Sequence, residues 1–445
     1  MAGDVSRRRF LAGAAALGAL GIGFHWPPQA ASGEEGELNA WLVVAADGSV
    51  TVRIAEAEMG QGVTTALAMI VAEELECDWR GVRTEFASVN RNHRDGRPYG
   101  RMLTGGFCSV RGGRAGLHRA AAEARERLVA AAAARWGVPA ASCRAEQGFV
   151  RHAGSGRQLG YGELAKAAAR PPVREPPLKS PAEYRLLGRP LARLDTPAKV
   201  DGSALYGIDV RLPGMLYAAI AHCPVVGGTL ERFDEAEALR RPGVAAIVEV
   251  AGALAAVADN WWRANEALAA VRVTWREGDN AKLDSGVLRD RFRAELASNG
   301  ELACERGDFA AAMAVASRRL EVLYEMPFLA HAAMEPMNAT AWVTEDRVDV
   351  WLGTQSPDRV AAAASRLTAL NLDRIHVHQC YLGGTDAGVG DGFGRRFESD
   401  CAEQAIALSK RFARPVKVLW SREQDMRNDF YRPMSTVACN AGLDA

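Results

Sequence analysis

Alternating apolar and polar positions near the start of the chain predict a β-hairpin that leads into a glycine loop. Residues 41–44 are apolar, residues 47–48 form a typical Asp-Gly turn, and residues 50–54 alternate between apolar and polar side chains. After the glycines of residues 59–62, apolar positions recur three and four residues apart over residues 64–76, the spacing of one helix face. We therefore expect the order strand, turn, strand, glycine loop, helix.

A second helix and a small α/β unit follow. Residues 116–136 keep apolar side chains on one face, and Gly137 and Pro139 provide a stop signal. Six prolines between residues 170 and 190 are typical of an extended linker, so we place a domain boundary there. The elements predicted beyond it are strands at residues 214–220, 244–250 and 271–275 and a helix at residues 260–270.

The last third of the chain alternates between polar helices and short apolar strands. Residues 281–320 have a polar, helical pattern. The elements predicted after them are strands at residues 320–324, 341–343, 348–352, 375–378 and 416–420 and a helix at residues 398–410. Residues 437–440 read as the start of a strand without a visible partner, and Gly442 reads as a bend. This ending predicts a fragment or a truncated gene product.

The N-terminal segment has the pattern of a twin-arginine export signal. Arg7 and Arg8 precede an apolar run over residues 11–24, and Ala30 and Ala31 lie near a loosely matching cleavage site. The run is 14 residues long, shorter than the roughly 20 that a membrane-spanning helix needs. We therefore expect a signal peptide and a periplasmic protein. This pathway exports folded proteins, which favours a large bound organic cofactor.

Composition and charge narrow the possible functions. A chain of 445 residues is too long for one domain of typical size, and 48% hydrophobic with 24% charged residues excludes a disordered chain or a polytopic membrane protein. Lys and Arg total 54, as do Asp and Glu, so no basic charge favours nucleic acid as a partner. The eight cysteines include no CxxC pair, which argues against an iron–sulfur cluster in this chain. We interpret them as small buried hydrophobes, with disulfides as the alternative.

Two glycine loops are candidates for ligand binding. Residues 60–62 lie between a predicted strand and a helix N-terminus, where unpaired N–H groups suit a phosphate; an ordinary glycine turn is the alternative. Residues 383–394 contain six glycines and precede two arginines suited to a phosphate; a surface loop is the alternative. Phe393 stands where a dinucleotide fingerprint requires its third glycine, which argues against a nicotinamide enzyme.

Three further polar residues are candidates for chemistry. His331 and Glu335 are four apart and would share a face if helical, but they are too few for a metal site, and a satisfied core histidine is the alternative. Gln355 follows an apolar strand, at the end where sheets tend to bind ligands. No Ser-His-Asp order or nucleophile elbow is visible, which argues against a hydrolase.

Several of these motifs, taken in order, resemble the molybdopterin-binding large subunit of the xanthine dehydrogenase/aldehyde oxidase superfamily, in particular its isoquinoline 1-oxidoreductase beta subunit type. The matching segments are residues 58–67, 331–336, 353–355 and 392–396. Residues 195–275 resemble the small a/b hammerhead domain of that family, and residues 104–109 its second cofactor loop. The resemblance implies an α+β fold, with molybdopterin-binding lobes of mixed sheets and helices.

The resemblance also implies a cofactor, a site and partners. The cofactor is molybdopterin cytosine dinucleotide, which holds molybdenum through its own dithiolene. The residues implied to bind it are Gly60, Gln61, Gly62, Gly106, Ser109, Gln355, Gly392, Phe393, Gly394 and Arg395. His331 and Glu335 are the candidates for the substrate pocket. A small [2Fe-2S] subunit would collect the electrons, and a cytochrome c is a further candidate acceptor.

The implied reaction is hydroxylation of a carbon beside a ring nitrogen or of an aldehyde carbonyl, with water as the oxygen source. Two departures bear on it: residues 385–391 look inserted into the glycine loop, and the family's general-base glutamate would lie beyond Ala445. The alternative function is therefore a truncated, catalytically inactive cofactor-binding or assembly fragment. The domains predicted are a signal peptide at residues 1–31, a molybdopterin-binding lobe with its linker at 32–190, a hammerhead domain at 191–290 and the first part of the main molybdopterin-binding domain at 291–445.

Overall fold

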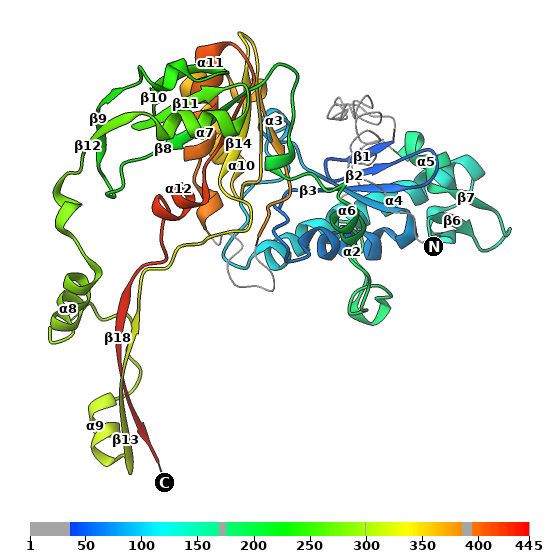
Figure 1. The fold of residues 1–445 in the computed structure, drawn as a ribbon. Coiled ribbons are helices and arrows are strands. Elements are labelled where there is room, and N and C mark those ends of the chain that lie inside the picture. Colours follow the sequence, from blue (N-terminus) through cyan, green and yellow to red (C-terminus); the bar gives the residue numbers. More distant parts are fainter. Residues whose placement is uncertain (1–35, 169–174, 299, 385–393, 445) are drawn as a thin grey trace, which may run out of the picture. The chain divides into compact units, whose positions relative to one another are not determined.

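A four-stranded sheet opens the computed structural model, which describes residues 36–168, 175–298, 300–384 and 394–444 (Figure 1). Its strands, in sheet order, are β1 (Glu37–Asn39), β2 (Leu42–Val44), β3 (Val50–Ile54) and β4 (Val82–Phe86). β1, β2 and β3 are antiparallel, and β4 runs parallel to β3. The hairpin predicted at residues 41–54 is therefore confirmed.

Helices α2 (Val63–Leu75) and α4 (Ser109–Trp136) pack against this sheet and against each other (Figure 1). Leu67 of α2 meets Leu117 and Leu128 of α4 in one buried cluster with the strands. Burial of such a side chain contributes about 1.5–3 kcal/mol. This apolar contact fixes the position of α2, and with it the glycine loop that precedes the helix.

The two helices end where the sequence predicts and differ at one start. Glu76 ends α2 with a left-handed φ of 57°, and Gly137 ends α4 with a φ of 66°. Helix α4 begins at Ser109, before the predicted residue 116. Three glycines in residues 112–116 lower the helix propensity there, which hid the first two turns.

Smaller elements complete the region before residue 202. A three-stranded sheet in the described residues has the order β5 (Cys143–Glu146), β6 (Phe149–His152), β7 (Gln158–Gly160). The short helices are α3 (Val89–Arg94), α5 (Tyr161–Ala168) and α6 (Thr196–Asp201). Tyr161 is fully buried, and its hydroxyl donates to the carbonyl of Leu75 at 2.6 Å, so α5 is fixed to the end of α2.

A seven-stranded mixed sheet forms the largest core of the described residues. Its order is β10 (Val244–Val250), β11 (Ala253–Ala258), β8 (Leu216–Ala221), β17 (Val416–Leu419), β14 (Asn338–Val343), β15 (Val348–Leu352), β16 (Ile375–Gln379). The pairs β8–β17 and β15–β16 are parallel and the others antiparallel. The sheet joins strands from both sides of residue 290. The domain boundaries and the hammerhead assignment stay predictions.

Helices and a short strand pair flank this sheet. The helices are α7 (Trp261–Ala269), α10 (Pro357–Thr368), α11 (Asp400–Phe412) and α12 (Arg422–Arg427), and the pair is β9 (Thr229–Asp234) with β12 (Arg272–Arg276). The sequence pattern missed β11, because its run of small apolar residues shows no alternation. Helices and strands are interspersed along the described chain, so the predicted α+β class is confirmed.

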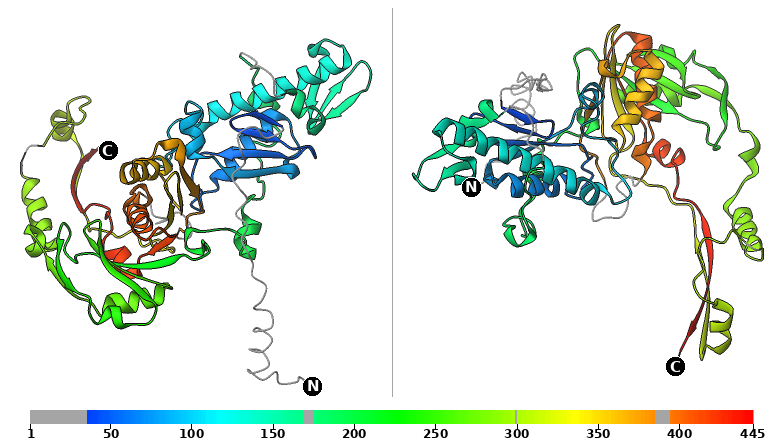
Figure 2. Two further views of the ribbon diagram at one scale, coloured as in Figure 1. Left: turned by 90° about the horizontal axis from the view of Figure 1, so that it is seen from above. Right: turned by 180° about the vertical axis from the view of Figure 1, so that it is seen from behind.

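The last described strand has a partner, which corrects the prediction for residues 437–440. β18 (Ser435–Leu443) pairs along its whole length with β13 (Arg318–Met326), and helices α8 (Ser285–Glu295) and α9 (Phe309–Val315) precede this ribbon (Figure 2). Gly442 lies inside the strand, opposite Arg319, and is not a bend. The partner was missed because it lies more than one hundred residues earlier. In the described residues, no helix has the length and apolar character needed to cross a membrane.

Candidate cofactor-binding site

The first glycine loop lies between β3 and α2, as predicted, and it surrounds a buried carboxylate. Glu58 has no exposed surface. Its carboxylate accepts hydrogen bonds from the N–H groups of Gly60 (2.9 Å), Gly62 (3.0 Å) and Thr64 (3.1 Å). The hydroxyl of Thr64 also donates to it, at 3.0 Å. The N–H groups of Gly60 and Gly62 are therefore already engaged, which corrects the expectation that they are unpaired and face a phosphate.

The outer side of this loop is open. Gly60 is exposed with a φ of 110°, and a Cβ built there meets no atom of the described residues within 4 Å. The side chain of Gln61 folds back, donating to the carbonyl of Ala57 (2.9 Å) and accepting from the N–H of Met59 (2.7 Å). The loop is thus fixed from inside and leaves its main chain accessible from outside. Contact of these residues with a cofactor stays a prediction.

The second predicted loop, residues 104–109, contacts the first. The hydroxyl of Thr104 accepts from the N–H of Ala57 at 2.7 Å and donates to Glu56 at 2.9 Å. Ser109 donates to the same carboxylate at 3.1 Å. Burial raises the pKa of Glu56, although both hydroxyls oppose the shift. The tip of the loop is exposed, and Gly106 there has a φ of 62°.

Gln355 connects three of the predicted segments. Its side chain is buried, and its amide donates to the carbonyl of Thr104 at 3.0 Å and accepts from the N–H of Gly394 at 3.2 Å. Its main chain adds bonds to the same loops, from the N–H of Thr104 (2.8 Å) and to the carbonyl of Arg396 (2.9 Å). Its amide thus positions loops, and a contact with the metal stays a prediction. Gly392 and Phe393, also predicted here, lie outside the described residues.

Arg395 is buried and engaged within the chain. Its guanidinium bonds to Asp400 at 2.8 Å and approaches Asp429 at 3.4 Å, and it lies over the rings of Trp420 and Phe430. Burial lowers the pKa of this guanidinium, but the two carboxylates reverse the effect and raise it. The neighbouring Arg396 is also buried and donates to a main-chain carbonyl. Neither contact shows an arginine presented to a phosphate, and the role of Arg395 beside the metal stays a prediction.

His331 and Glu335 do not share a helix face, because residues 328–337 are not helical. Nδ1 of His331 lies 2.8 Å from Asp429, which is the contact expected of a satisfied core histidine. The carboxylate of Glu335 accepts from the N–H of Ile208 (3.0 Å), the N–H of Gly383 (2.9 Å) and an asparagine amide (2.8 Å). These bonds direct the two side chains to different partners. Their role in a substrate pocket stays a prediction.

Sequence reasoning missed the ion pairs that surround the first loop. Arg193 donates to Glu58 at 3.2 Å, to Asp195 at 2.6 Å and to the carbonyl of Gly60 at 2.6 Å. Lys199 pairs with Asp195 at 2.6 Å. Burial opposes ionisation of Asp195, but the bonds from these two cations lower its pKa to about 2. The alternating charges of residues 193–199 were the available signal, although their partner lies about 135 residues away.

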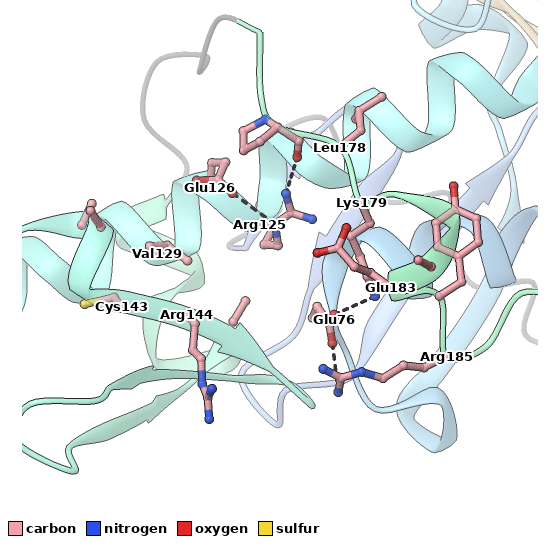
Figure 3. Close-up of a pocket in the computed structure, with 16 residues that line it drawn as sticks. Glu76, Arg125, Glu126, Val129, Cys143, Arg144, Leu178, Lys179, Glu183 and Arg185 are labelled. Carbon is pink, nitrogen blue, oxygen red and sulfur yellow. Dashed lines mark hydrogen bonds and ion pairs between the residues drawn. The ribbon is translucent and has the colours of Figure 1, made fainter.

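A groove in the described residues lies elsewhere, at the opposite end of α2 (Figure 3). It encloses about 860 Å³. Its walls come from the end of α2, the middle of α4, residues 140–145 and residues 177–185. Many of its charged groups bond to one another: Arg125 to Glu126, and Glu76 to Lys179 and Arg185 (Figure 3). Among the described residues that line it, none was predicted as a site residue.

Cysteines and acidic side chains contribute no evident metal site to the part of the chain that the structure describes. No three His, Cys, Asp or Glu side chains there are placed to share a metal ion. All eight cysteines are free thiols. Four of them, Cys77, Cys223, Cys380 and Cys401, are buried, and Cys108, Cys304 and Cys439 are exposed.

Comparison with known proteins places these loops in a family. Models of the molybdopterin cofactor-binding domain match residues 7–208 and 293–445. The chain is 32% identical to the beta subunit of isoquinoline 1-oxidoreductase from Brevundimonas diminuta, over 98% of this chain and 61% of that protein. It is 30% identical to one of the subunits of nicotinate dehydrogenase from Pseudomonas putida, over 88% of this chain and 33% of that one.

A third relative is named for a different cofactor, pyrroloquinoline-quinone. The membrane-bound aldehyde dehydrogenase [pyrroloquinoline-quinone] of Gluconacetobacter polyoxogenes is 29% identical, over 92% of this chain and 53% of its own length. The chain thus spans between a third and about three fifths of the length of these three relatives. The domain matches and the identity over nearly the whole chain agree with the resemblance of the motifs. The chain therefore belongs to the molybdopterin-binding large subunits of the xanthine dehydrogenase/aldehyde oxidase superfamily.

Proposed function

We propose that the protein is the cofactor-binding subunit of a molybdenum hydroxylase that oxidises an N-heterocycle or an aldehyde. The observation that supports this most is the position of Gln355, whose amide connects loops 251 and 39 residues away in sequence. Those loops are the ones that carry the family's motifs. Two relatives are named for isoquinoline and nicotinate, which are nitrogen heterocycles, and a third is named for aldehydes. These names support the proposed substrate class.

The loops around Gln355 suit a large cofactor, which we propose to be molybdopterin cytosine dinucleotide. Gly60 and Gly106 both have positive φ and exposed main chain, so neither residue places a side chain of its own between its backbone and a ligand. Thr104 and Gln355 hold these loops together by hydrogen bonds between buried groups. A preorganised backbone of this kind binds a ligand without a further cost of ordering the loops.

The chain's own residues would orient the cofactor and exclude water from its inner side. When bound, the cofactor supplies a metal that accepts two electrons during the reaction. In the proposed reaction a carbon–hydrogen bond of the substrate breaks and a carbon–oxygen bond forms with oxygen from water. Two electrons and two protons are released. The electrons would pass to a [2Fe-2S] subunit and then to a cytochrome c, and we propose both as partners.

The direct test is analysis of the protein, produced from its own gene in a host that makes the cofactor. The expected result is about one molybdenum and one cytosine nucleotide per chain, detected by elemental analysis and by chromatography after acid release. Protein that stays free of both, while a known molybdenum hydroxylase from the same host is loaded, would refute the proposal. Loading with a different nucleotide would refute only the cytosine form.

We also propose export to the periplasm by the twin-arginine pathway. The supporting residues, Arg7 and Arg8, lie outside the described residues. Replacing both with lysine should keep the protein in the cytoplasm, as shown by fractionation, whereas replacing Arg111 with lysine should not. Equal periplasmic amounts of the double variant and the wild type would contradict this proposal.

A further inference from the structure

The N-terminus of α2 already holds an anion that belongs to the chain itself. Helix N-termini carry unpaired N–H groups and a partial positive charge, and bound anions commonly occupy them. Here the carboxylate of Glu58 occupies that place, fully buried, with bonds from Gly60, Gly62 and Thr64. These donors lie two, four and six residues after Glu58 in the sequence. The chain therefore wraps around this carboxylate on its way from β3 into α2.

Cations from a distant segment complete the environment of Glu58. A buried carboxylate is costly unless charges and hydrogen bonds compensate it. Arg193 donates to Glu58 at 3.2 Å, and Lys199 lies 4.0 Å from it. Both also bond to the buried Asp195, so the two carboxylates share two cations. Arg193 donates to the carbonyl of Gly60 as well, at 2.6 Å, so the same guanidinium holds the carboxylate and the loop.

The main chain beside Glu58 connects this cluster to the rest of the site. The carbonyl of Glu58 accepts from the N–H of Leu382 at 3.2 Å, in the segment that follows β16. The N–H of Ala57 donates to Thr104, whose carbonyl binds Gln355. Any shift of Glu58 would therefore move the first glycine loop relative to the other two.

We propose that Glu58 is a positioning residue for the cofactor, and this inference rests on the proposed function. Its carboxylate replaces an external anion at the start of α2 and fixes the loop of residues 60–62 from inside. The exposed outer edge of that loop is then presented to the cofactor in one conformation. The carboxylate also occupies the N–H groups of Gly60, Gly62 and Thr64, so the phosphates of the cofactor would bind beside the loop and not on the helix end.

The test compares Glu58→Gln with Glu73→Gln, a control carboxylate that is equally buried at the other end of α2. Molybdenum and nucleotide content, and the rate of nucleotide release, are measured alongside the unfolding temperature of each protein. We expect Glu58→Gln to retain the cofactor roughly 10- to 100-fold more weakly, the range seen for residues that orient metal ligands. Glu73→Gln should lower the unfolding temperature and keep cofactor retention within about twofold of the wild type.

A second variant covers the case in which Glu58→Gln does not fold. Arg193→Lys keeps the positive charge of a side chain that is 35% exposed, but it removes the fork that joins Glu58 to the carbonyl of Gly60. It should fold and lose the cofactor several-fold faster than the wild type. Unchanged retention in the folded variants, or losses that follow the unfolding temperature equally in Glu73→Gln, would overturn the inference. A wild type without molybdenum would instead refute the proposed function.

Discussion

The two ends of α2 use the same chemistry for different purposes. At its start, Glu58 accepts N–H groups of the glycine loop. Near its end, Glu73 accepts those of Arg185 (2.8 Å), Leu186 (2.6 Å) and Leu187 (3.0 Å), and Lys179 forms an ion pair with it. Each of these buried carboxylates thus fixes a non-helical segment. Glu58 fixes the glycine loop that directly precedes α2, and Glu73 fixes residues 185–187, more than one hundred residues later in the sequence. The segment held at the far end is the proline-rich stretch.

The two ends of α2 differ in the surface that lies beside each fixed segment. Near the start of α2, Gly60 has accessible main chain. Ala57, shortly before it, bonds to Thr104, which Gln355 connects to Gly394. The end of α2 lies beside the groove of about 860 Å³, whose charged groups pair with one another. A large pocket is ordinarily the first hypothesis for a binding site. We nevertheless predict the cofactor site at the start of α2, because the loops that carry the motifs are bonded together there.

The largest effect is expected from removing the carboxylate at the far end. Glu73→Ala leaves Lys179 and three N–H groups without their buried partner, which should lower the free energy of unfolding by about 3–5 kcal/mol. Urea unfolding measures the loss. The molybdenum content of the folded protein should stay unchanged. Loss of metal from folded Glu73→Ala would contradict the assignment of the site to the other end of α2.

The next largest effect is expected from removing a buried side-chain amide, either at the predicted site (Gln355) or away from it (Asn92). Gln355→Ala leaves the carbonyl of Thr104 and the N–H of Gly394 unpaired, at a cost of about 2–3 kcal/mol. Asn92→Ala is the matched control, because its buried amide also donates to a main-chain carbonyl and accepts from a main-chain N–H. Both should destabilise the protein, but only Gln355→Ala should lose molybdenum. Equal loss of molybdenum in both variants would contradict the prediction that Gln355 lies at the cofactor site.

A smaller effect is expected at the second loop. A Cβ at Gly105 would clash with the ring of Phe397, so Gly105→Ala should cost about 1–3 kcal/mol through overpacking. Gly116→Ala, in α4, meets no described atom within 4 Å and should stabilise the helix by about 0.5–1 kcal/mol. Thermal unfolding measures both changes. Opposite signs are expected, and a stabilised Gly105→Ala would show that the loop adopts another conformation.

The last predicted effect is a dependence of protein stability on pH, caused by Asp195 near the start of α2. The pKa of Asp195 is lowered to about 2, from an ordinary value of 3.8, so its ion pairs stabilise the fold above that ordinary value and are lost as the pH falls toward 2. The wild type should have a higher free energy of unfolding than Asp195→Asn. This difference should be constant above about pH 5 and should shrink between about pH 4 and 2. Urea unfolding across this range measures the difference. A difference that grows with acid would contradict the ion-pair cluster.

Local patterns predicted the elements around the site, and distant contacts explain what they missed. Alternation and helical spacing located β3, α2 and the glycine loop between them. The same motif contains Glu58, but spacing does not tell whether a carboxylate points into a loop or out of it. Arg193, the cation beside it, lies 135 residues away. Pairing over such distances depends on the folded chain and has no periodic signature.

The three-loop convergence was predicted only as a resemblance. The loop of residues 104–109, Gln355 and Gly394 were each assigned to the cofactor, and the structure shows that Gln355 bonds to Thr104 of this loop and to Gly394. The bonding could not be derived from the sequence, because it requires the seven-stranded sheet to place Gln355, which follows β15, next to the loop that precedes α4. The expectation that the N–H groups of Gly60 and Gly62 are unpaired was wrong for a related reason, since both donate to Glu58 of the same chain.

The most direct test of the account is to locate molybdenum in crystals of the loaded protein by anomalous diffraction at its absorption edge. The account predicts a single peak beside the loops that contain Gly60, Gly106 and Gln355, at the start of α2. A peak in the groove between Arg125, Lys179 and Arg185, at the other end of the helix, would contradict it.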